Sequence, residues 1–289
     1  MNKIIQIFRY LVFVLLYITG IPFIIRELFQ KDKITIIAFH DIPSDSSDRI
    51  FKYLLKKYNI IPLKWFVDLV EKGSIDKKSI PSKALIITID DGLKQNFNLL
   101  KNIKKYKIPV TIFLTTGIIG TNRGFWWNHN NTTLSTENLK KISDKERLIK
   151  LEESGFLETK ELDSRESLSF NEIEKMSFIV DFQSHSVTHP ILPLCDDKKA
   201  YYEIEESKKF LISNFSFDIY AFAYPNGNYS KREEKMIKSS GYLCALTTDI
   251  GFNKINTDLF KLNRLSCGRG ESVIETAVKT SGLWGKIKY

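Results

Sequence analysis

The residues in this chain that could carry out chemistry are two adjacent carboxylates and two closely spaced imidazoles. Asp90 and Asp91 are followed by Gly92, and three residues separate His185 from His189 in the segment HSVTHP. Neighbouring side chains in extended backbone point in opposite directions, so one aspartate could bind a metal while the other faces a water molecule. Two imidazoles four positions apart can converge on one cation, and an aspartate could supply a third ligand.

Each pair also has a plain structural interpretation. An Asp-Asp-Gly triplet is commonly a solvated turn or a helix N-terminus. The segment HSVTHP differs from the HExxH pattern of zinc proteases, because Ser186 follows the first histidine and Pro190 favours a loop. Taken together, two histidines and one carboxylate form a site with open positions, which lowers the pKa of bound water toward about 7 and polarises a carbonyl oxygen. With the second carboxylate as proton acceptor, the pattern predicts hydrolysis at a carbonyl carbon.

Alternating strands and helices are expected to position these residues. Continuous apolar runs separated by helical patterns imply a parallel sheet covered by helices, and at least six such runs favour a closed or nearly closed α/β barrel. The predicted strands are 34–39, 84–89, 110–114, 178–182, 219–224, 243–248 and 259–265. The predicted helices lie near 47–58, 65–72, 95–106, 144–153, 198–212 and 231–239.

The polar motifs fall where the predicted strands end. His40 follows the first strand, the Asp90-Asp91 pair the second, His185 the fourth, and Pro225-Asn226 the fifth. Reactive residues of parallel barrels lie at the carboxyl ends of strands, so this coincidence carries more weight than any single motif.

Three segments in this order and spacing resemble the polysaccharide deacetylases, which are carbohydrate esterase family 4 and share the NodB-homology domain. The segments are TIDDG (88–92), HSVTHP (185–190) and AYPNG (223–227). The resemblance extends from about Ile34 to Arg264. It implies a distorted (β/α) barrel of about seven parallel strands and a divalent metal, usually Zn²⁺. The implied reaction is removal of N-acetyl groups from polymers of the N-acetylglucosamine type.

The resemblance also implies roles for individual residues. Asp90 matches the base that deprotonates a metal-bound water, and Asp91, His185 and His189 match the metal ligands. In the third motif, Pro225 and Asn226 are candidate substrate-binding residues, and the backbone N–H near Asn226 would help to hold the tetrahedral oxyanion.

This chain departs from the family pattern in two places. The family commonly has Arg-x-Pro-Tyr at the third motif, whereas this chain has Ala223 at the position of the arginine that steadies the base. Arg264 is a candidate substitute, and a surface or structural ion pair is its alternative role. The family's late Leu-x-His motif, which supplies the general acid, is also unmatched, because no histidine follows His189.

His40 and a tryptophan pair offer further candidates. The segment AFH (38–40) resembles the arrangement in biofilm-polysaccharide deacetylases, in which the motif order is permuted and this histidine comes first. His40 would then protonate the leaving amine, with a structural strand-end histidine as the alternative. Trp126 and Trp127 could form an aromatic wall for a sugar ring, with Trp127 as the substrate-binding candidate, or anchor a rim segment to the barrel.

The first 33 residues differ in kind from the rest. The run from Ile4 to Ile25 is apolar except for Arg9, and it fits a single membrane anchor, an interfacial helix in the membrane plane, or a buried helix. Basic residues flank both ends, so the positive-inside rule does not orient it. We expect an N-terminal hydrophobic helix in 1–33, a catalytic domain in 34–289, and a polar insertion near 120–170.

Composition limits the classes of protein that remain. The 289 residues are 43% hydrophobic and 27% charged, which excludes a disordered chain, a collagen-like fibre and a disulfide scaffold. The three cysteines lack metal or redox spacing. The net charge of +9 favours anionic surroundings, but without a basic stripe interleaved with aromatic residues we expect no nucleic-acid partner.

The sequence therefore predicts a metal-dependent hydrolase that removes N-acetyl groups from a cell-surface polysaccharide or its precursor and associates with a membrane. The polymer and the side of the membrane stay open. Two alternatives are a saccharide-binding relative that has lost activity with the missing arginine, and a hydrolase of another small amide on the same barrel.

Overall fold

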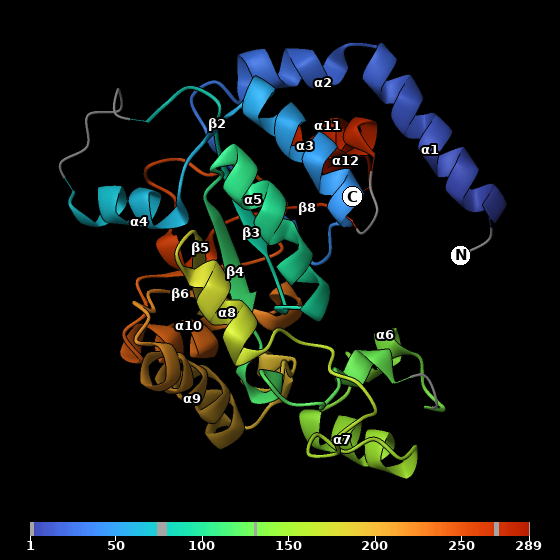
Figure 1. Ribbon diagram of the computed structural model, residues 1–289, viewed down its shortest axis with the longest axis vertical. Coiled ribbons are helices and arrows are strands. Elements are labelled where there is room, and N and C mark those ends of the chain that lie inside the picture. Colours follow the sequence, from blue (N-terminus) through green and yellow to red (C-terminus); the bar gives the residue numbers. More distant parts are fainter. Residues whose placement is uncertain (1–2, 74–79, 130–131, 269–271, 289) are drawn as a thin grey trace.

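A curled sheet of eight parallel strands forms the centre of the structure (Figure 1). The computed structural model describes residues 3–73, 80–129, 132–268 and 272–288. Seven strands follow the order β7-β6-β5-β4-β3-β1-β8, and the short β2 pairs with β3. The strands are β1 (Ile34–Phe39), β2 (Asn59–Ile60), β3 (Ala84–Ile89), β4 (Val110–Leu114), β5 (Val180–Ser184), β6 (Ala221–Ala223), β7 (Cys244–Leu246) and β8 (Leu265–Ser266).

The central strands are buried on both faces, which explains their continuous apolar sequences. Every residue of β1, β3 and β4 is buried, and β1 pairs with β3 from Ile34 opposite Ala84 to Phe39 opposite Ile89. The two ends of the strand order also come together, because Leu262 bridges to Leu246 of β7 just before the chain enters β8, which pairs with β1. This curled parallel sheet with its helices confirms the predicted α/β fold of the barrel type.

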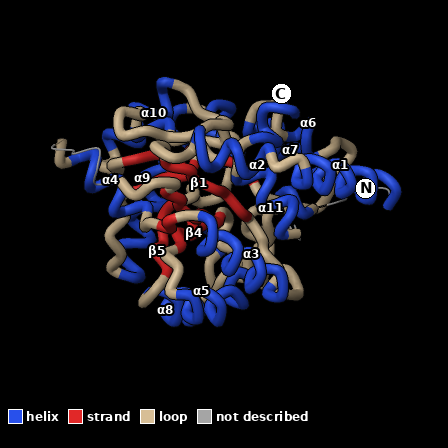
Figure 2. The backbone as a smooth tube through the Cα atoms, turned by 90° about the horizontal axis from the view of Figure 1, so that it is seen from above, coloured by secondary structure: helices blue, strands red, loops and turns tan. Residues whose placement is uncertain are grey.

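Helices surround the sheet when it is viewed from above (Figure 2). Short single-turn segments also occur, among them the 3-10 turns η5 (Trp126–Asn128) and η7 (Pro225–Gly227). The α-helices are α1 (Lys3–Ile18), α2 (Ile21–Ile24), α3 (Ser44–Lys57), α4 (Leu63–Glu71), α5 (Leu100–Tyr106), α6 (Thr136–Leu139), α7 (Asp144–Glu153), α8 (Phe170–Ser177), α9 (Asp197–Phe215), α10 (Lys231–Ser239), α11 (Val273–Thr280) and α12 (Leu283–Lys288).

Two of the predicted strands need correction. The fourth was expected at 178–182, but β5 begins at Val180, because Phe178 caps α8 and its side chain is 92% exposed. The last was expected at 259–265, where the chain forms a 3-10 turn from Leu259 to Lys261 and only then the two-residue β8. The ranges predicted for β1, β3, β4, α7 and α10 agree with the structure.

The predicted N-terminal apolar helix is present, but it is broken. After α1, Gly20 adopts a φ of +72°, a left-handed conformation that glycine takes without steric cost, and the chain continues through α2 into the π-helical turn η1 (Ile25–Phe29). Within the described residues, no one helix has the length and apolarity to cross a membrane. A pair bent by 57°, Ile7–Ile18 with Ile21–Phe29, meets both requirements when the two are taken together.

The polar segment predicted as an insertion near 120–170 forms a small lobe beside the sheet. It contains η5, α6 and α7, and the last two lie away from the strands (Figure 1). Trp126, Leu139, Leu151 and Phe156 pack together as a separate apolar cluster in this lobe. Residues 130–131 of the predicted insertion lie outside the described residues.

Two phenylalanines test the strand assignments. Phe113 of β4 is fully buried, so Phe113→Ala is expected to lower the free energy of unfolding by about 3–5 kcal/mol. The matched substitution Phe178→Ala removes an exposed ring and is expected to change it by less than about 0.5 kcal/mol. Urea denaturation of both variants measures the difference, and a large loss in the Phe178 variant would contradict the start of β5 at Val180.

Candidate active site and metal centre

Side chains from four strand ends line one cavity of about 190 Å³ at the carboxyl edge of the sheet. They follow β1, β3, β5 and β6, as the sequence predicted for a parallel sheet. The residues that line this cavity are His40, Asp90, Asp91, Trp126, Trp127, Thr136, Lys140, His185, His189, Tyr224, Asn226, Gly227 and Thr248.

The backbone after β3 turns sharply and separates the two aspartates. Asp91 has a φ of +71°, and Gly92 follows with a φ of +68°. A Cβ atom at Gly92 would collide with the side chain of Leu114, so this position requires glycine. The turn directs Asp90 toward Arg264 and Asp91 toward the paired histidines.

Asp91, His185 and His189 form a buried group with the composition of a metal site. The Asp91 Oδ1 atom lies 3.6 Å from His185 Nε2 and 3.7 Å from His189 Nε2, and one ligand atom from each residue falls within 4.8 Å of the others. Two atoms that each lie about 2.1 Å from one tetrahedral ion are roughly 3.4 Å apart. Asp91 Oδ1 is also buried and has no hydrogen-bond partner among the described residues, as expected for an atom that completes its coordination with a cation.

Hydrogen bonding fixes the tautomer of His185. Its Nδ1 lies 2.8 Å from the carbonyl oxygen of Ala223, and a carbonyl can only accept, so Nδ1 carries the proton and donates it. The lone pair of Nε2 is therefore directed to the side of Asp91, which is the usual arrangement of a metal-binding histidine.

Burial disfavours charge on all three members of the group. It raises the pKa of Asp91 and lowers the pKa of His185 and, more strongly, of His189. Both imidazoles are therefore neutral at pH 7, which is the form that binds metal. A divalent cation would compensate the carboxylate charge that the buried surroundings disfavour.

The loop that carries the two histidines is held by a buried carboxylate from α9. Glu203 accepts hydrogen bonds from the Val187 N–H at 2.8 Å, the Thr188 N–H at 2.7 Å and the Thr188 hydroxyl at 2.7 Å. Within the loop, the His189 N–H donates to Ser186 Oγ at 3.0 Å. These bonds keep both imidazoles in place despite the left-handed backbone of Ser186 and His189.

Arg264 forms a buried ion pair with Asp90. Its Nη1 lies 2.7 Å from Asp90 Oδ1, and its Nε donates to the carbonyl oxygen of Thr247 at 2.7 Å. Burial by itself raises the pKa of Asp90, but the charge and the hydrogen bond of the Arg264 guanidinium outweigh it and hold this pKa well below its usual range. Asp90 is therefore ionised at neutral pH. The guanidinium that contacts it comes from the segment just before β8 and not from the AYPNG segment.

The remaining candidate residues lie in different positions relative to the cavity. His40 is exposed and lines the cavity, and Asn226, which has a φ of +55° in η7, lines it as well. Pro225 is buried in the same turn and is not among the residues that line the cavity. The Trp127 ring lies 4.4 Å from the His189 ring.

Trp126 and Trp127 differ in environment although they are adjacent. Trp126 is buried in the cluster of the insertion, and its Nε1–H donates to the His189 carbonyl oxygen at 3.0 Å. Trp127 is only partly buried and lines the cavity beside His189. Of the two interpretations of the pair, an anchor for the insertion fits the position of Trp126. An aromatic wall for a sugar ring fits the position of Trp127.

Several residues of the site were not found from the sequence. Glu203 stands inside a predicted amphipathic helix, where one more glutamate gives no signal of a role in a distant loop. Thr136 reaches the cavity from α6 in the insertion, Lys140 from the position just after this helix, and Thr248 from beyond β7. These three belong to segments without a recognisable motif, so only the folded structure brings them to the site.

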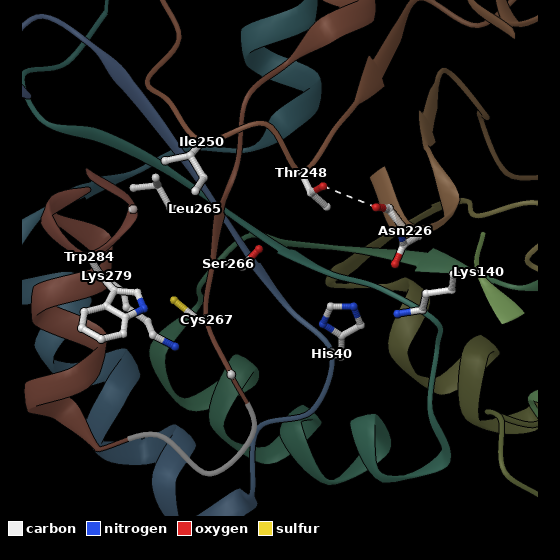
Figure 3. A pocket seen from close by; sticks show the side chains of 12 residues that line it. His40, Lys140, Asn226, Thr248, Ile250, Leu265, Ser266, Cys267, Lys279 and Trp284 are labelled. Atoms are coloured by element: carbon white, nitrogen blue, oxygen red, sulfur yellow. Dashed lines mark hydrogen bonds between the residues drawn. The ribbon is translucent and has the colours of Figure 1, made fainter. Parts of the chain in front are cut away.

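A larger cavity of about 510 Å³ adjoins the first and shares His40, Lys140, Asn226 and Thr248 with it. Figure 3 shows these four residues on one side of the cavity and Lys279 and Trp284 on the other, with Ser266 and Cys267 between them. The predicted metal ligands therefore lie at one end of a longer depression that runs toward the C-terminal helices.

The fold and the site identify the family of the chain. The family profile described as polysaccharide deacetylase matches residues 77–245, more than half of the sequence, and the chain belongs to this family. It is accordingly a hydrolase of carbon–nitrogen bonds other than peptide bonds. A comparison with curated proteins gives no match.

Solved deacetylase structures share the fold at low sequence identity. Streptococcus pyogenes deacetylase PplD in complex with acetate is 19% identical with a TM-score of 0.63, over 86% of this chain and 98% of that one. IcaB from Ammonifex degensii is 16% identical with a TM-score of 0.62, over 87% and 98% of the two chains. The de-N-acetylase from Aggregatibacter actinomycetemcomitans is 15% identical with a TM-score of 0.59, over 85% and 99%.

The ligand assignment can be tested by metal content. His185→Ala removes one donor from the buried group, and Asp91→Asn replaces a charged carboxylate donor by a weaker amide oxygen, so we expect Zn²⁺ affinity to fall by about tenfold or more in each. His129→Ala is the matched control, because His129 lies in the insertion and contacts the Ser154 carbonyl instead. Competitive titration with a chromogenic chelator measures the affinity, and full Zn²⁺ affinity in the His185 variant would contradict the site.

Proposed function

We propose that this chain removes N-acetyl groups from the amino sugars of a cell-surface polysaccharide or its precursor. Asp90 acts as the general base, and Asp91, His185 and His189 hold a divalent metal. One observation carries the proposal: an ionised carboxylate, fixed by Arg264, lies next to a buried Asp-His-His group in a single cavity.

The donor set suits Zn²⁺. Two imidazole nitrogens and one carboxylate oxygen, with positions left for water and substrate, are typical of catalytic zinc. When bound, such an ion supplies a Lewis acid that polarises the acetyl carbonyl and lowers the pKa of water. The chain's contribution to the site is a set of neutral, oriented ligands, of which His185 is fixed by Ala223 and His189 by the loop that Glu203 holds.

Asp90 receives the proton of the attacking water. Arg264 occupies its Oδ1, which leaves the other oxygen for the water, and the low pKa of Asp90 keeps the carboxylate ionised. As the water oxygen bonds to the acetyl carbon, its proton passes to Asp90. Because the guanidinium stays in contact with Asp90, the orientation of this carboxylate is set before the substrate arrives.

His40 and Asn226 complete the reaction on the other side of the cavity. In the turn η7, the Gly227 and Asn228 N–H groups already donate to carbonyl oxygens of the same turn, and the Asn226 N–H is the candidate donor to the developing oxyanion. His40 donates a proton to the sugar nitrogen as the carbon–nitrogen bond breaks. The products are acetate and a free amino sugar.

Two observations support a saccharide as the substrate. The partly buried ring of Trp127 lines the cavity, and sugar rings pack on such aromatic faces. The adjoining cavity of about 510 Å³ offers room for sugar units beyond the one that reacts. Structures with the same fold include a deacetylase in complex with acetate and a de-N-acetylase.

The contact between Arg264 and Asp90 also bears on the alternative of an inactive saccharide-binding relative. That alternative depended on the absence of an arginine from the third motif. Arg264 reaches Asp90 at 2.7 Å from another part of the chain, and this contact supports an active enzyme over the inactive relative.

The role of Asp90 is tested by Asp90→Asn. The variant keeps the size of the side chain but removes the proton acceptor, so acetate release from N-acetylglucosamine oligomers is expected to fall by about 10²–10⁴-fold. Zn²⁺ content is expected to stay at the wild-type level, because Asp90 is not a ligand. An unchanged turnover number in a folded, metal-loaded variant would show that Asp90 is not the base.

The role of Arg264 is tested by the pH dependence of kcat/KM. The guanidinium lowers the pKa of Asp90, so without it burial dominates and raises that pKa. In Arg264→Gln the carboxylate is therefore protonated at higher pH, and the acid limb of the profile is expected to move upward. Arg264→Lys keeps the charge and is expected to move the limb less. Superimposable profiles for the wild type and the Gln variant would exclude this role.

A further inference from the structure

The N-terminal helices carry a concentration of exposed apolar side chains that neither the fold nor the catalytic site explains. More than half of the exposed large hydrophobic side chains among the described residues lie between residues 5 and 29. They are Ile5, Ile7, Phe8, Tyr10, Leu11, Leu15, Tyr17, Ile18, Ile21, Phe23, Ile24, Leu28 and Phe29, and we call them the N-terminal apolar face.

Helix α1 is apolar on two opposite sides, and the domain covers only one of them. The buried side carries Phe13, whose ring lies 4.4 Å from that of Trp284 in α12. The opposite side carries Ile7, Leu11, Leu15 and Ile18, which recur every three or four residues and are all exposed. A second apolar side that no described part of the chain covers indicates an external apolar environment.

The helices are attached to the catalytic domain at several points. Arg9 of α1 pairs with Glu275 of α11 at 3.4 Å. At the other end, Gln30 is fully buried and donates to the Thr35 hydroxyl and the Thr280 carbonyl, each at 2.8 Å. The bent pair thus lies along α11 with its apolar face turned outward, and Figure 2 shows α1 beside α11 at the periphery of the molecule.

The charges around this face suit an anionic surface. Glu27 is the one acidic residue between positions 3 and 31, and both Arg26 and Lys83 pair with it at 2.9 Å. Exposed Lys31 and half-buried Lys33 follow the last helical turn, with exposed Asp32 between them, and the chain as a whole carries a net charge of +9. A second copy of the chain would bring like charges together across the same face, whereas a lipid surface with anionic headgroups would neutralise them.

We propose that residues 5–29 bind an anionic lipid membrane as a bent helical pair lying in the membrane plane, with the catalytic domain attached to its inner side. The apolar face enters the boundary between headgroups and acyl chains, and the basic residues beside it contact the headgroups. This inference does not depend on the reaction that the active site catalyses.

Binding of the full chain to vesicles tests the proposal. We expect sedimentation with phosphatidylglycerol-containing vesicles, and weaker binding to pure phosphatidylcholine or at high salt. The double variant F8D/L11D places charges on the apolar face and is expected to lower the partition coefficient by about tenfold or more. Both side chains are exposed, with Phe8 at 68% and Leu11 at 57%, so the fold is expected to remain intact.

The control is Phe178→Asp, which changes a still more exposed ring at the C-terminal cap of α8 and should leave vesicle binding unchanged. Equal binding of the wild type and F8D/L11D, or no binding of the wild type to anionic vesicles, would overturn the proposal. A dimer in light scattering that F8D/L11D dissociates, without vesicle binding, would assign the face to a second copy instead.

Labelling distinguishes an in-plane helix pair from one that crosses the bilayer. The three native cysteines are buried, so single cysteines introduced at the basic positions that flank the pair, Lys3→Cys and Lys31→Cys, are the thiols to be labelled. With protein added to sealed vesicles, a membrane-impermeant maleimide should label both positions if the pair lies in the plane. Protection of one position until detergent is added would show a spanning arrangement and refute the proposal.

Discussion

The buried ion pair between Asp90 and Arg264 links the closure of the sheet to the chemistry of the site. Asp90 directly follows β3, and Arg264 lies between the Leu262 bridge to β7 and the start of β8. Both side chains are almost inaccessible to water, so removal of either would leave an uncompensated buried charge, which is strongly destabilising. The segment that brings the two ends of the sheet together therefore also supplies the guanidinium that keeps the carboxylate ionised.

Backbone strain is concentrated around the cavity. Among the described residues, seven that are not glycine have a positive φ, and four of them, Asp91, Ser186, His189 and Asn226, belong to the three motifs at the site. Each such conformation costs of the order of 1 kcal/mol or more. The surrounding bonds, above all those of Glu203 to the histidine loop, offset this cost and keep the ligands in the orientation that the group needs.

The sequence predicted the parts of the molecule that local pattern determines. The runs of β1, β3 and β4 are apolar throughout because both faces of the sheet are covered, so their limits could be read directly. The strand-end rule then placed the Asp pair, the histidines and Asn226 together. The contact of Arg264 with Asp90 spans 174 positions, and the support from Glu203 depends on how α9 packs. Such pairings leave no periodic or local signal, so they became visible only in the folded chain.

Trp284 connects the N-terminal helices with the larger cavity. Its ring contacts Phe13 of α1, and the same residue forms part of the wall of that cavity, which His40 also lines. Any occupant that shifts this tryptophan must also shift the packing beneath α1, and displacement of α1 must in turn reshape the cavity. A ligand in the cavity would then change the affinity of α1 for its binding partner. Because coupling between two sites is reciprocal, that partner would change the affinity of the cavity for its ligand by the same factor.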